Sequence, residues 1–186
     1  MRKSFGSAPV CYPQPVFILA AYDDMGNANA MNAAWGGISE ENEISLCIGA
    51  GRKTLKNLQE TGAFTVSMGT ADQVKQCDYV GIVSGNHVPA KLEQIGWTVT
   101  KAETVNAPLI DQLPMALECK YISFDPDTCR LVGQIVNVCA DESVLNADGK
   151  IDPAKLRPIT FDPMNNAYLV LGEKVGNAFR DGLELK

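Results

Sequence analysis

The sequence lacks the long apolar runs of membrane proteins and the basic stretches of nucleic-acid-binding proteins. Its longest apolar run covers residues 16–21, whereas a helix needs roughly 20 such residues to span a bilayer. The formal net charge is −6 and there is no long run of lysine or arginine, and neutralising nucleic-acid phosphates requires a basic stripe. No signal-peptide core follows Met1, Arg2 and Lys3. We therefore expect a cytoplasmic protein that binds neither a membrane nor a nucleic acid.

Histidine is nearly absent, and the cysteines follow no metal-binding or disulfide pattern. The single histidine is His87, and no two cysteines form a C-x-x-C pair, so neither a zinc site nor a disulfide framework is indicated. A redox role for Cys47 is the alternative to simple packing. We expect no metal, and free, mostly buried thiols at Cys11, Cys47, Cys77, Cys119, Cys129 and Cys139.

The composition is that of an ordinary globular protein. Hydrophobic residues make up 46% and charged residues 20% of the 186 residues. A chain of this length buries about 68–70% of the surface that it exposes when unfolded, so its core needs no metal or disulfide. We expect a single domain that covers residues 1–186.

Short segments of alternating or β-branched residues dominate the chain and predict strands. The short helices expected are residues 54–61, residues 70 to about 80, a turn around Lys91 and a turn after Asp152, whereas residues 39–43 are expected to form a solvated loop. No βαβ rhythm is present, and no G-x-G-x-x-G follows the first strand, which argues against a Rossmann fold. We therefore expect a mainly β protein with short α-helices, in a closed or split antiparallel barrel. The strands expected are residues 16–22, 29–35, 44–48, 64–68, 97–102, 115–124, 129–140 and 168–171.

Two basic residues precede the predicted helix at residues 54–61, where acidic residues are usually found. Thr54 can cap this helix and Gly62 can end it. A helix start carries about half a positive charge, so Arg52 and Lys53 repel it unless an anion lies between them. A phosphate accepts hydrogen bonds from backbone N–H, hydroxyl and guanidinium groups together, which indicates a phosphate site. The alternative is that both cations point into water.

The strand before this helix has little side-chain bulk. A flat ring can lie close to such a backbone, and Asn29 and Asn32 offer amide groups to its polar edge. Together with the basic pair, this pattern indicates a planar, phosphorylated ligand. The small residues are Ala30, Ala33, Ala34, Gly36 and Gly37.

These motifs resemble the flavin reductase-like, FMN-binding split-barrel family. The resemblance lies in N-A-M-N-A-A-W at residues 29–35 and R-K-T-L-K-N-L at residues 52–58. Two further stretches resemble its flavoredoxin branch, D-Y-V-G-I-V-S-G-N-H-V-P-A-K at residues 78–91 and Y-L-V-L-G-E-K-V-G-N-A-F at residues 168–179. Asn32 departs from the hydroxyl residue that many members have. The resemblance implies a Greek-key antiparallel split barrel, bound FMN, and a homodimer with the flavin near the subunit boundary.

The resemblance also implies where the FMN would bind. Its phosphate would lie on Arg52, Lys53 and Thr54, and Lys91 is a second candidate for phosphate or substrate, the alternative being a solvated lysine. Trp35 would pack on the ring edge, on a second subunit or in the core. The residues expected along the ring are Asn29, Ala30, Met31, Asn32, Ala33, Ala34, Trp35, Cys47, Ile48 and Gly49.

The implied function is an FMN-dependent oxidoreductase that takes electrons from NAD(P)H and passes them to a second acceptor. Hydride transfer to a flavin requires no general base, so we predict no catalytic residue, and a chemical role for His87 is the weaker interpretation. The alternatives are a flavoredoxin-like electron carrier with a redox protein partner, a relative of pyridoxamine-phosphate oxidase, and a cofactor-free barrel.

Overall fold

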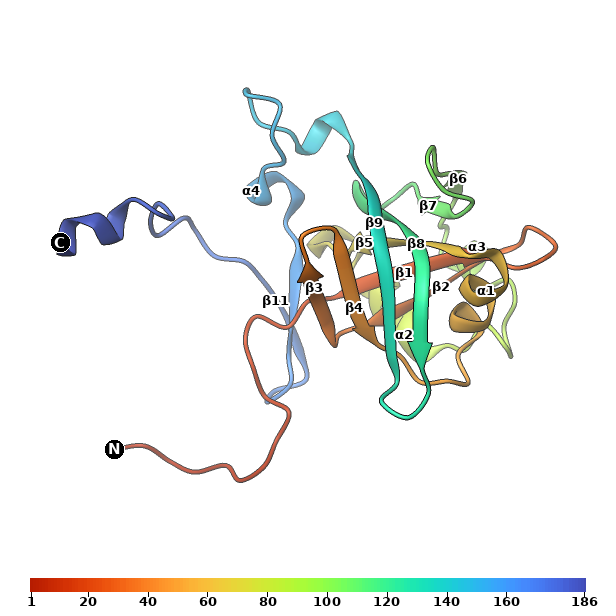
Figure 1. Cartoon of the computed structure of the whole chain (residues 1–186), viewed down its shortest axis with the longest axis horizontal. Coiled ribbons are helices and arrows are strands. Elements are labelled where there is room, and N and C mark those ends of the chain that lie inside the picture. The colour runs from red at the N-terminus through yellow and green to blue at the C-terminus, as the bar shows by residue number, and fades with distance from the viewer.

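The computed structural model describes residues 1–186 and is built around one strongly curled antiparallel sheet (Figure 1). Its seven strands lie in the order β2-β1-β5-β8-β9-β4-β3. They are β1 (Phe17–Tyr22), β2 (Ala28–Ala33), β3 (Gly36–Glu40), β4 (Glu43–Cys47), β5 (Ala63–Met68), β8 (Met115–Asp125) and β9 (Arg130–Ala140).

The two edge strands of this sheet, β2 and β3, are consecutive in the chain. Only Ala34 and Trp35 separate them, so the Cα atoms of Ala33 and Gly36 lie at most about 11 Å apart. A seven-stranded sheet whose edges meet in this way has to curl. The result is an open barrel split between β2 and β3, and the predicted mainly β split barrel is confirmed.

The remaining elements are short and cover the barrel. Two hairpins pair β6 (Val99–Lys101) with β7 (Pro108–Ile110), and β10 (Ile159–Asp162) with β11 (Ala167–Val170). Three 3-10 turns are present, at Ala71–Gln73, Glu142–Val144 and Asp181–Leu185. The helices are α1 (Lys53–Thr61), α2 (Val74–Ile82), α3 (Lys91–Gln94) and α4 (Pro153–Leu156).

Strand β1 is buried on both faces and divides the core into two layers. Phe17, Leu19 and Ala21 face the inside of the curled sheet, where Leu55 and Leu58 of α1 join them. The alternate residues Ile18 and Ala20 face outward and pack with Cys77 and Val80 of α2, Leu92 of α3 and Trp97. The helices α1 and α2 are therefore held against opposite faces of the sheet, and both contact β2.

Several predicted boundaries were wrong. The strand expected at residues 29–35 ends at Ala33, and the loop expected at residues 39–43 is instead strand β3 followed by a tight turn. Strand β3 has few inward apolar residues and its Ile38 is 66% exposed, so no alternation marks it. It forms because Gly36 approaches β4 so closely that a Cβ there would lie 2.6 Å from the Ser45 carbonyl oxygen.

The helix starts and the short strands also differ from expectation. Thr70 precedes a 3-10 turn without capping it, and α2 starts only at Val74. Helix α1 starts one residue early, with Arg52 at the N-cap position. Strands β7 and β10 were not predicted, because three and four residues are too few to show a period.

Candidate functional site

A small pocket lies where β2, the start of α1 and the loop after α2 meet. Its volume is about 40 Å³, far below the roughly 300–1,000 Å³ of clefts that hold a whole ligand, so it can take only a small polar part of one. The lining residues are Asn29, Met31, Asn32, Arg52, Lys53, Thr54, Val80, Gly81, Val83, Ser84, Gly85 and Lys91.

The start of α1 offers backbone donors to this pocket. The first helical hydrogen bond runs from the Lys56 N–H to the Arg52 carbonyl, so the N–H groups before Lys56 have no acceptor within the helix. No side chain caps this end, and no acidic residue lies in the first turn. The helix therefore presents an uncompensated positive end.

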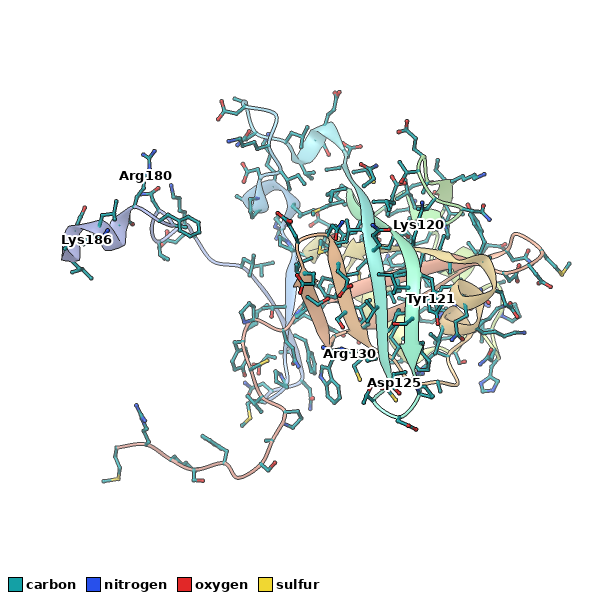
Figure 2. The ribbon with its side chains drawn as sticks, in the orientation of Figure 1. Lys120, Tyr121, Asp125, Arg130, Arg180 and Lys186 are labelled. Atoms are coloured by element: carbon teal, nitrogen blue, oxygen red, sulfur yellow. The ribbon has the colours of Figure 1, made fainter.

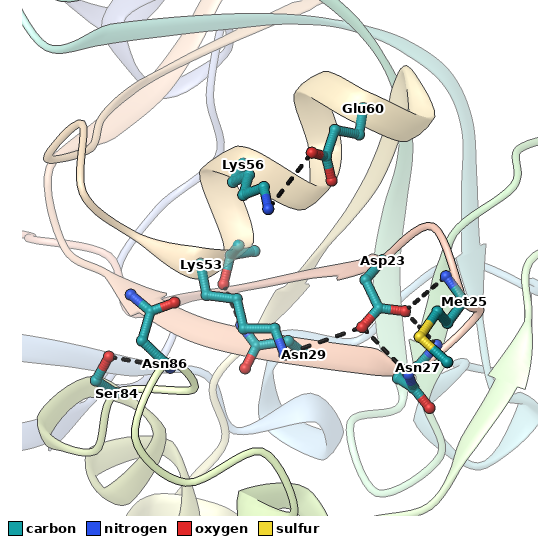
Figure 3. Close-up of polar contacts among 10 residues, drawn as sticks. Asp23, Met25, Asn27, Asn29, Lys53, Lys56, Glu60, Ser84 and Asn86 are labelled. Carbon is teal, nitrogen blue, oxygen red and sulfur yellow. Dashed lines mark hydrogen bonds and ion pairs between the residues drawn. The ribbon is translucent and has the colours of Figure 1, made fainter.

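The two cations at this helix start differ in their partners. The Lys53 Nζ atom lies 3.9 Å from Asp23 Oδ2, and the N–H groups of Met25 and Asn27 donate to the other carboxylate oxygen, Oδ1 (Figure 3). Burial raises the pKa of Asp23, but the hydrogen bonds from Asn27 and Met25 and the Lys53 charge outweigh it, so the pKa is below its usual value. Arg52 is exposed and forms no ion pair.

Asn29 and Thr54 form a buried polar pair beneath these cations. The Asn29 Nδ2 atom donates to Thr54 Oγ1 at 2.7 Å, and the two residues are 2% and 1% exposed. No group of the chain accepts the Thr54 hydroxyl proton, and the Asn29 Oδ1 atom has no hydrogen-bond partner. A buried acceptor left unpaired costs about 1–3 kcal/mol, so this pair is suited to a ligand with both donors and acceptors.

Two glycines, Gly81 in α2 and Gly85 in the loop after it, allow the chain from α2 into this loop to pack closely against β2. A Cβ on Gly85 would lie 2.0 Å from Asn29 Oδ1, and a Cβ on Gly81 would lie 3.0 Å from the Asn32 Cβ. The Asn32 Nδ2 atom donates to the Cys77 carbonyl at 3.1 Å. Asn32 thus holds α2 in place, and the protein occupies one of the two N–H donors of its side-chain amide.

The loop after α2 is also tied to the loop before α1. The side-chain amide of Asn86 donates to the Gly51 carbonyl at 3.2 Å, and the backbone N–H of Asn86 donates to Ser84 Oγ (Figure 3). This pair of bonds positions Ser84 and Gly85 against the pocket.

Lys91 is buried, which makes the solvated interpretation wrong. It is 2% exposed, and its Nζ atom donates to the carbonyls of Val80 at 3.1 Å and Val83 at 2.8 Å. These carbonyls lie at the negative end of α2, where a cation is favourable. Burial, followed by the charges of Arg52 and Lys53, lowers the pKa of Lys91 to about 8.

A second, open concavity lies along β3 and β4 at the end of the β8–β9 hairpin, and we call it the shelf. Its volume is about 790 Å³. Trp35 and Cys47 both line it, and the Cys47 N–H donates to the Trp35 carbonyl. Trp35 is 51% exposed, so it is not a core residue. Arg130, on the wall of the shelf, appears beside β4 in Figure 2.

The structure therefore divides the predicted site residues into three groups. Seven line the small pocket: Asn29, Met31, Asn32, Arg52, Lys53, Thr54 and Lys91. Trp35 and Cys47 line the shelf, and Ala34 and Gly49 line neither concavity but lie in the chain segments between residues that do. The side chains of Ala30, Ala33 and Ile48 are in the core.

Sequence reasoning missed the lining residues that follow α2, which are Val80, Gly81, Val83, Ser84 and Gly85. The S-G-N motif at residues 84–86 was the available signal. His87 is exposed, forms no side-chain hydrogen bond and lies outside the pocket. All six cysteines are free, but only Cys77 and Cys119 are buried, and burial raises their pKa to about 11 and about 12.

No group of three or more His, Cys, Asp or Glu side chains is arranged to hold a metal ion. None of the helices combines the length and apolarity that crossing a membrane demands.

Known proteins share this fold and part of this sequence. Residues 10–155 match the family model described as flavin reductase like domain. The chain is similar to the flavoredoxin of Desulfovibrio vulgaris (Miyazaki F), with 36% identity, a TM-score of 0.93 and coverage of 98% of this chain and 100% of that one. It is also similar to a flavoredoxin from Methanosarcina acetivorans, with 26% identity, a TM-score of 0.88 and coverage of 100% of both chains.

Among curated proteins, an uncharacterised protein of Aeropyrum pernix is 28% identical over 116 residues, which are 61% of this chain and 43% of that protein. The chain spans about half the length of the curated relatives that it matches.

Proposed function

Because the chain belongs to the flavin reductase-like domain family, we propose that it is an oxidoreductase that binds FMN and uses it to pass electrons between two substrates. One observation carries this proposal. In the small pocket, Arg52 has no carboxylate partner, Thr54 has a spare hydroxyl proton, and Asn29 has an unpaired buried oxygen.

The ribityl phosphate of FMN suits these groups. A phosphate can accept from the Arg52 guanidinium, the Thr54 hydroxyl and the free N–H groups of α1. The neighbouring ribityl chain carries hydroxyl groups, and one of them can donate to Asn29 Oδ1. Lys53 and the buried Lys91 add positive charge nearby.

The ring of FMN would lie on the shelf rather than in the pocket, whose volume of about 40 Å³ is too small for a tricycle. Two segments, residues 33–35 and residues 47–52, lead from the pocket to the shelf, and the bond between Cys47 and Trp35 joins them. Ala34, Gly49 and Gly51 leave the backbone of these segments accessible. We place Trp35 and Cys47 beside the ring.

Bound FMN supplies the hydride and electron chemistry. The residues of this chain bind and orient it: the pocket holds the phosphate, the two small-residue segments support the ring, and one face of the ring is left open to a second substrate. We assign no proton-transfer step to a side chain of the pocket, because hydride transfer to a flavin requires no general base.

We propose NAD(P)H as the electron donor, in keeping with the flavin reductase-like family. The second candidate is an electron carrier that exchanges electrons with a redox protein partner and does not oxidise NAD(P)H. The similarity to two flavoredoxins favours this second candidate.

Anaerobic stopped-flow mixing separates the two. The protein is loaded with FMN, its oxidised flavin absorbance is recorded, and it is mixed with NADH or NADPH. Bleaching well within a second supports the reductase. No bleaching with either nucleotide, together with rapid reduction by a reduced ferredoxin, supports the carrier. A protein that takes up no FMN contradicts both.

We further propose that residues 1–186 act as one domain in a cytoplasmic homodimer. An FMN ring on an open shelf gains cover from a second copy, and a closed two-fold dimer is the commonest assembly of soluble proteins.

A further inference from the structure

The carboxyl-terminal tail, residues 172–186, leaves the body of the molecule. Figure 1 shows it projecting beyond β11, and Figure 2 places Arg180 and Lys186 far from the barrel. Every residue of the tail is exposed, and none forms a hydrogen bond with the rest of the chain. Its large apolar side chains are Val175 at 96% exposure, Phe179 at 100%, Leu183 at 55% and Leu185 at 92%.

Some polar groups of the tail bond to one another. The Asp181 carboxylate accepts from the backbone N–H and the side-chain amide of Asn177, and Lys174 Nζ donates to Asn177 Oδ1 at 2.7 Å. A 3-10 turn, Asp181–Leu185, follows. The apolar side chains of this segment are left in water, and their burial would be favourable.

An apolar groove of about 410 Å³ lies at the root of the tail. Prolines and aliphatic side chains line it, among them Met68, Met115, Leu156, Ile159 and Leu171. The lining hydroxyl of Thr160 is already bonded to the main chain at Gln14, so the groove offers apolar contact and no spare side-chain donor.

We propose that the tail of one copy docks in this groove of a second copy. Each chain carries one tail and one groove at the same place, so a two-fold exchange fills both grooves and leaves neither tail in water. Residues 172–185 can span about 46 Å when extended, which is ample to reach across a subunit boundary.

The charge of the tail is compatible with this partner. Three basic and three acidic side chains lie in it, at Lys174, Arg180 and Lys186 and at Glu173, Asp181 and Glu184. The side chains of the whole chain sum to −6, so the body carries the excess negative charge. A tail whose side chains balance meets little repulsion from the body of another copy.

Sedimentation equilibrium of the full chain without flavin tests the exchange. We expect a dimer, and we expect Phe179→Ser to raise its dissociation constant at least about 100-fold. Burial of one phenylalanine is worth about a tenfold to hundredfold change in an equilibrium constant, and each dimer loses two. The matched control is Met25→Ser, which removes an apolar side chain that is 82% exposed. It lies in the β1–β2 turn, at the opposite end of the molecule from the tail (Figure 1). This variant should leave the dissociation constant of the dimer unchanged.

Photocrosslinking tests where the tail docks. Phe179 is replaced by p-benzoylphenylalanine, and heavy-isotope and ordinary chains are mixed before irradiation. We expect crosslinks between different chains at Met68, Met115 or Leu156. A monomer at all concentrations, an unchanged Phe179→Ser dimer, equal weakening by Met25→Ser, or crosslinks outside the groove would each overturn the proposal. Since neither measurement uses flavin, failure here leaves the FMN proposal to its own test.

Discussion

At the start of α1, Arg52 carries a positive charge that no carboxylate of the chain neutralises. Its neighbour Lys53 lies near Asp23, and Lys56 lies near Glu60 one turn further along the helix (Figure 3). Arg52 is therefore the cation of this helix that is free to bind an anion with both branches of its guanidinium group.

Replacing Arg52 with alanine should weaken FMN binding by about 1.5–3 kcal/mol, the range for hydrogen bonds to a charged group. Flavin fluorescence titration measures the dissociation constant. Lys56→Ala is the matched control, because it removes one positive charge from the same helix at a side chain that is 74% exposed. Equal dissociation constants for the two variants would exclude Arg52 from the site.

Residue 85 has to be glycine because the Asn29 side chain leaves no room for a Cβ, and not because its φ angle is positive. A Cβ at this position would lie 2.0 Å from Asn29 Oδ1, and Asn29 is buried and bonded to Thr54. Gly85→Ala should therefore displace the Asn29 amide, lower the free energy of unfolding by about 1–3 kcal/mol and weaken FMN binding.

Urea denaturation measures the stability of this variant. Gly37→Ala serves as its control, since a Cβ at Gly37 meets no atom within 4 Å, and it should leave the unfolding free energy nearly unchanged. A Gly85→Ala protein with normal stability and affinity would show that Asn29 does not need its present position.

At the scale of elements, Lys91 joins α3 to the end of α2. Its ammonium group holds the carbonyls of Val80 and Val83, and burial with the charges of Arg52 and Lys53 lowers its pKa to about 8. In the ligand-free protein Lys91 thus loses its proton as the pH rises through about 8. A bound phosphate favours the charged form and raises this pKa, so binding takes up a proton above pH 8.

FMN affinity should accordingly be level just below pH 8 and fall as the pH rises above it. Lys91→Met should remove this fall while retaining most of the buried side-chain volume. Fluorescence titrations between about pH 7 and pH 9.5 measure the effect, below the ordinary lysine pKa of about 10.4. If FMN affinity fell equally with pH in the unsubstituted protein and in Lys91→Met, the protonation of Lys91 would not be coupled to phosphate binding.

Elements with a clear period were predictable. The apolar run of β1 and the alternation of apolar and polar residues in β4 and β5 predicted these strands directly. Burial on both faces produces an apolar run, and burial on one face produces alternation. Strand β3 could not, since Gly36 and Gly37 give no pattern and the strand depends on close approach to β4. Lys91 looked like a surface residue because nothing near it in the sequence shows which carbonyls it meets.

At the scale of the whole molecule, FMN should stabilise the fold by binding only to the native protein. At a concentration 100 times its dissociation constant, it should add about 2.7 kcal/mol to the unfolding free energy. Urea unfolding with and without FMN measures this gain. Riboflavin, which has the ring but no phosphate, should raise the unfolding free energy much less at the same concentration. Equal stabilisation by both would argue against a phosphate site at α1.

The sequence alone was enough to predict a mainly β barrel and to single out Arg52, Lys53 and Thr54, because alternation along a strand and charge beside a helix start are local properties. Only the tertiary structure decided that Gly81 and Gly85 close over Asn32 and Asn29, and that Trp35 and Cys47 line a shelf apart from the pocket. The physical reason is the curl of the sheet. It brings β2, α1 and the loop after α2 to one place, and no short stretch of sequence records which distant segments meet there.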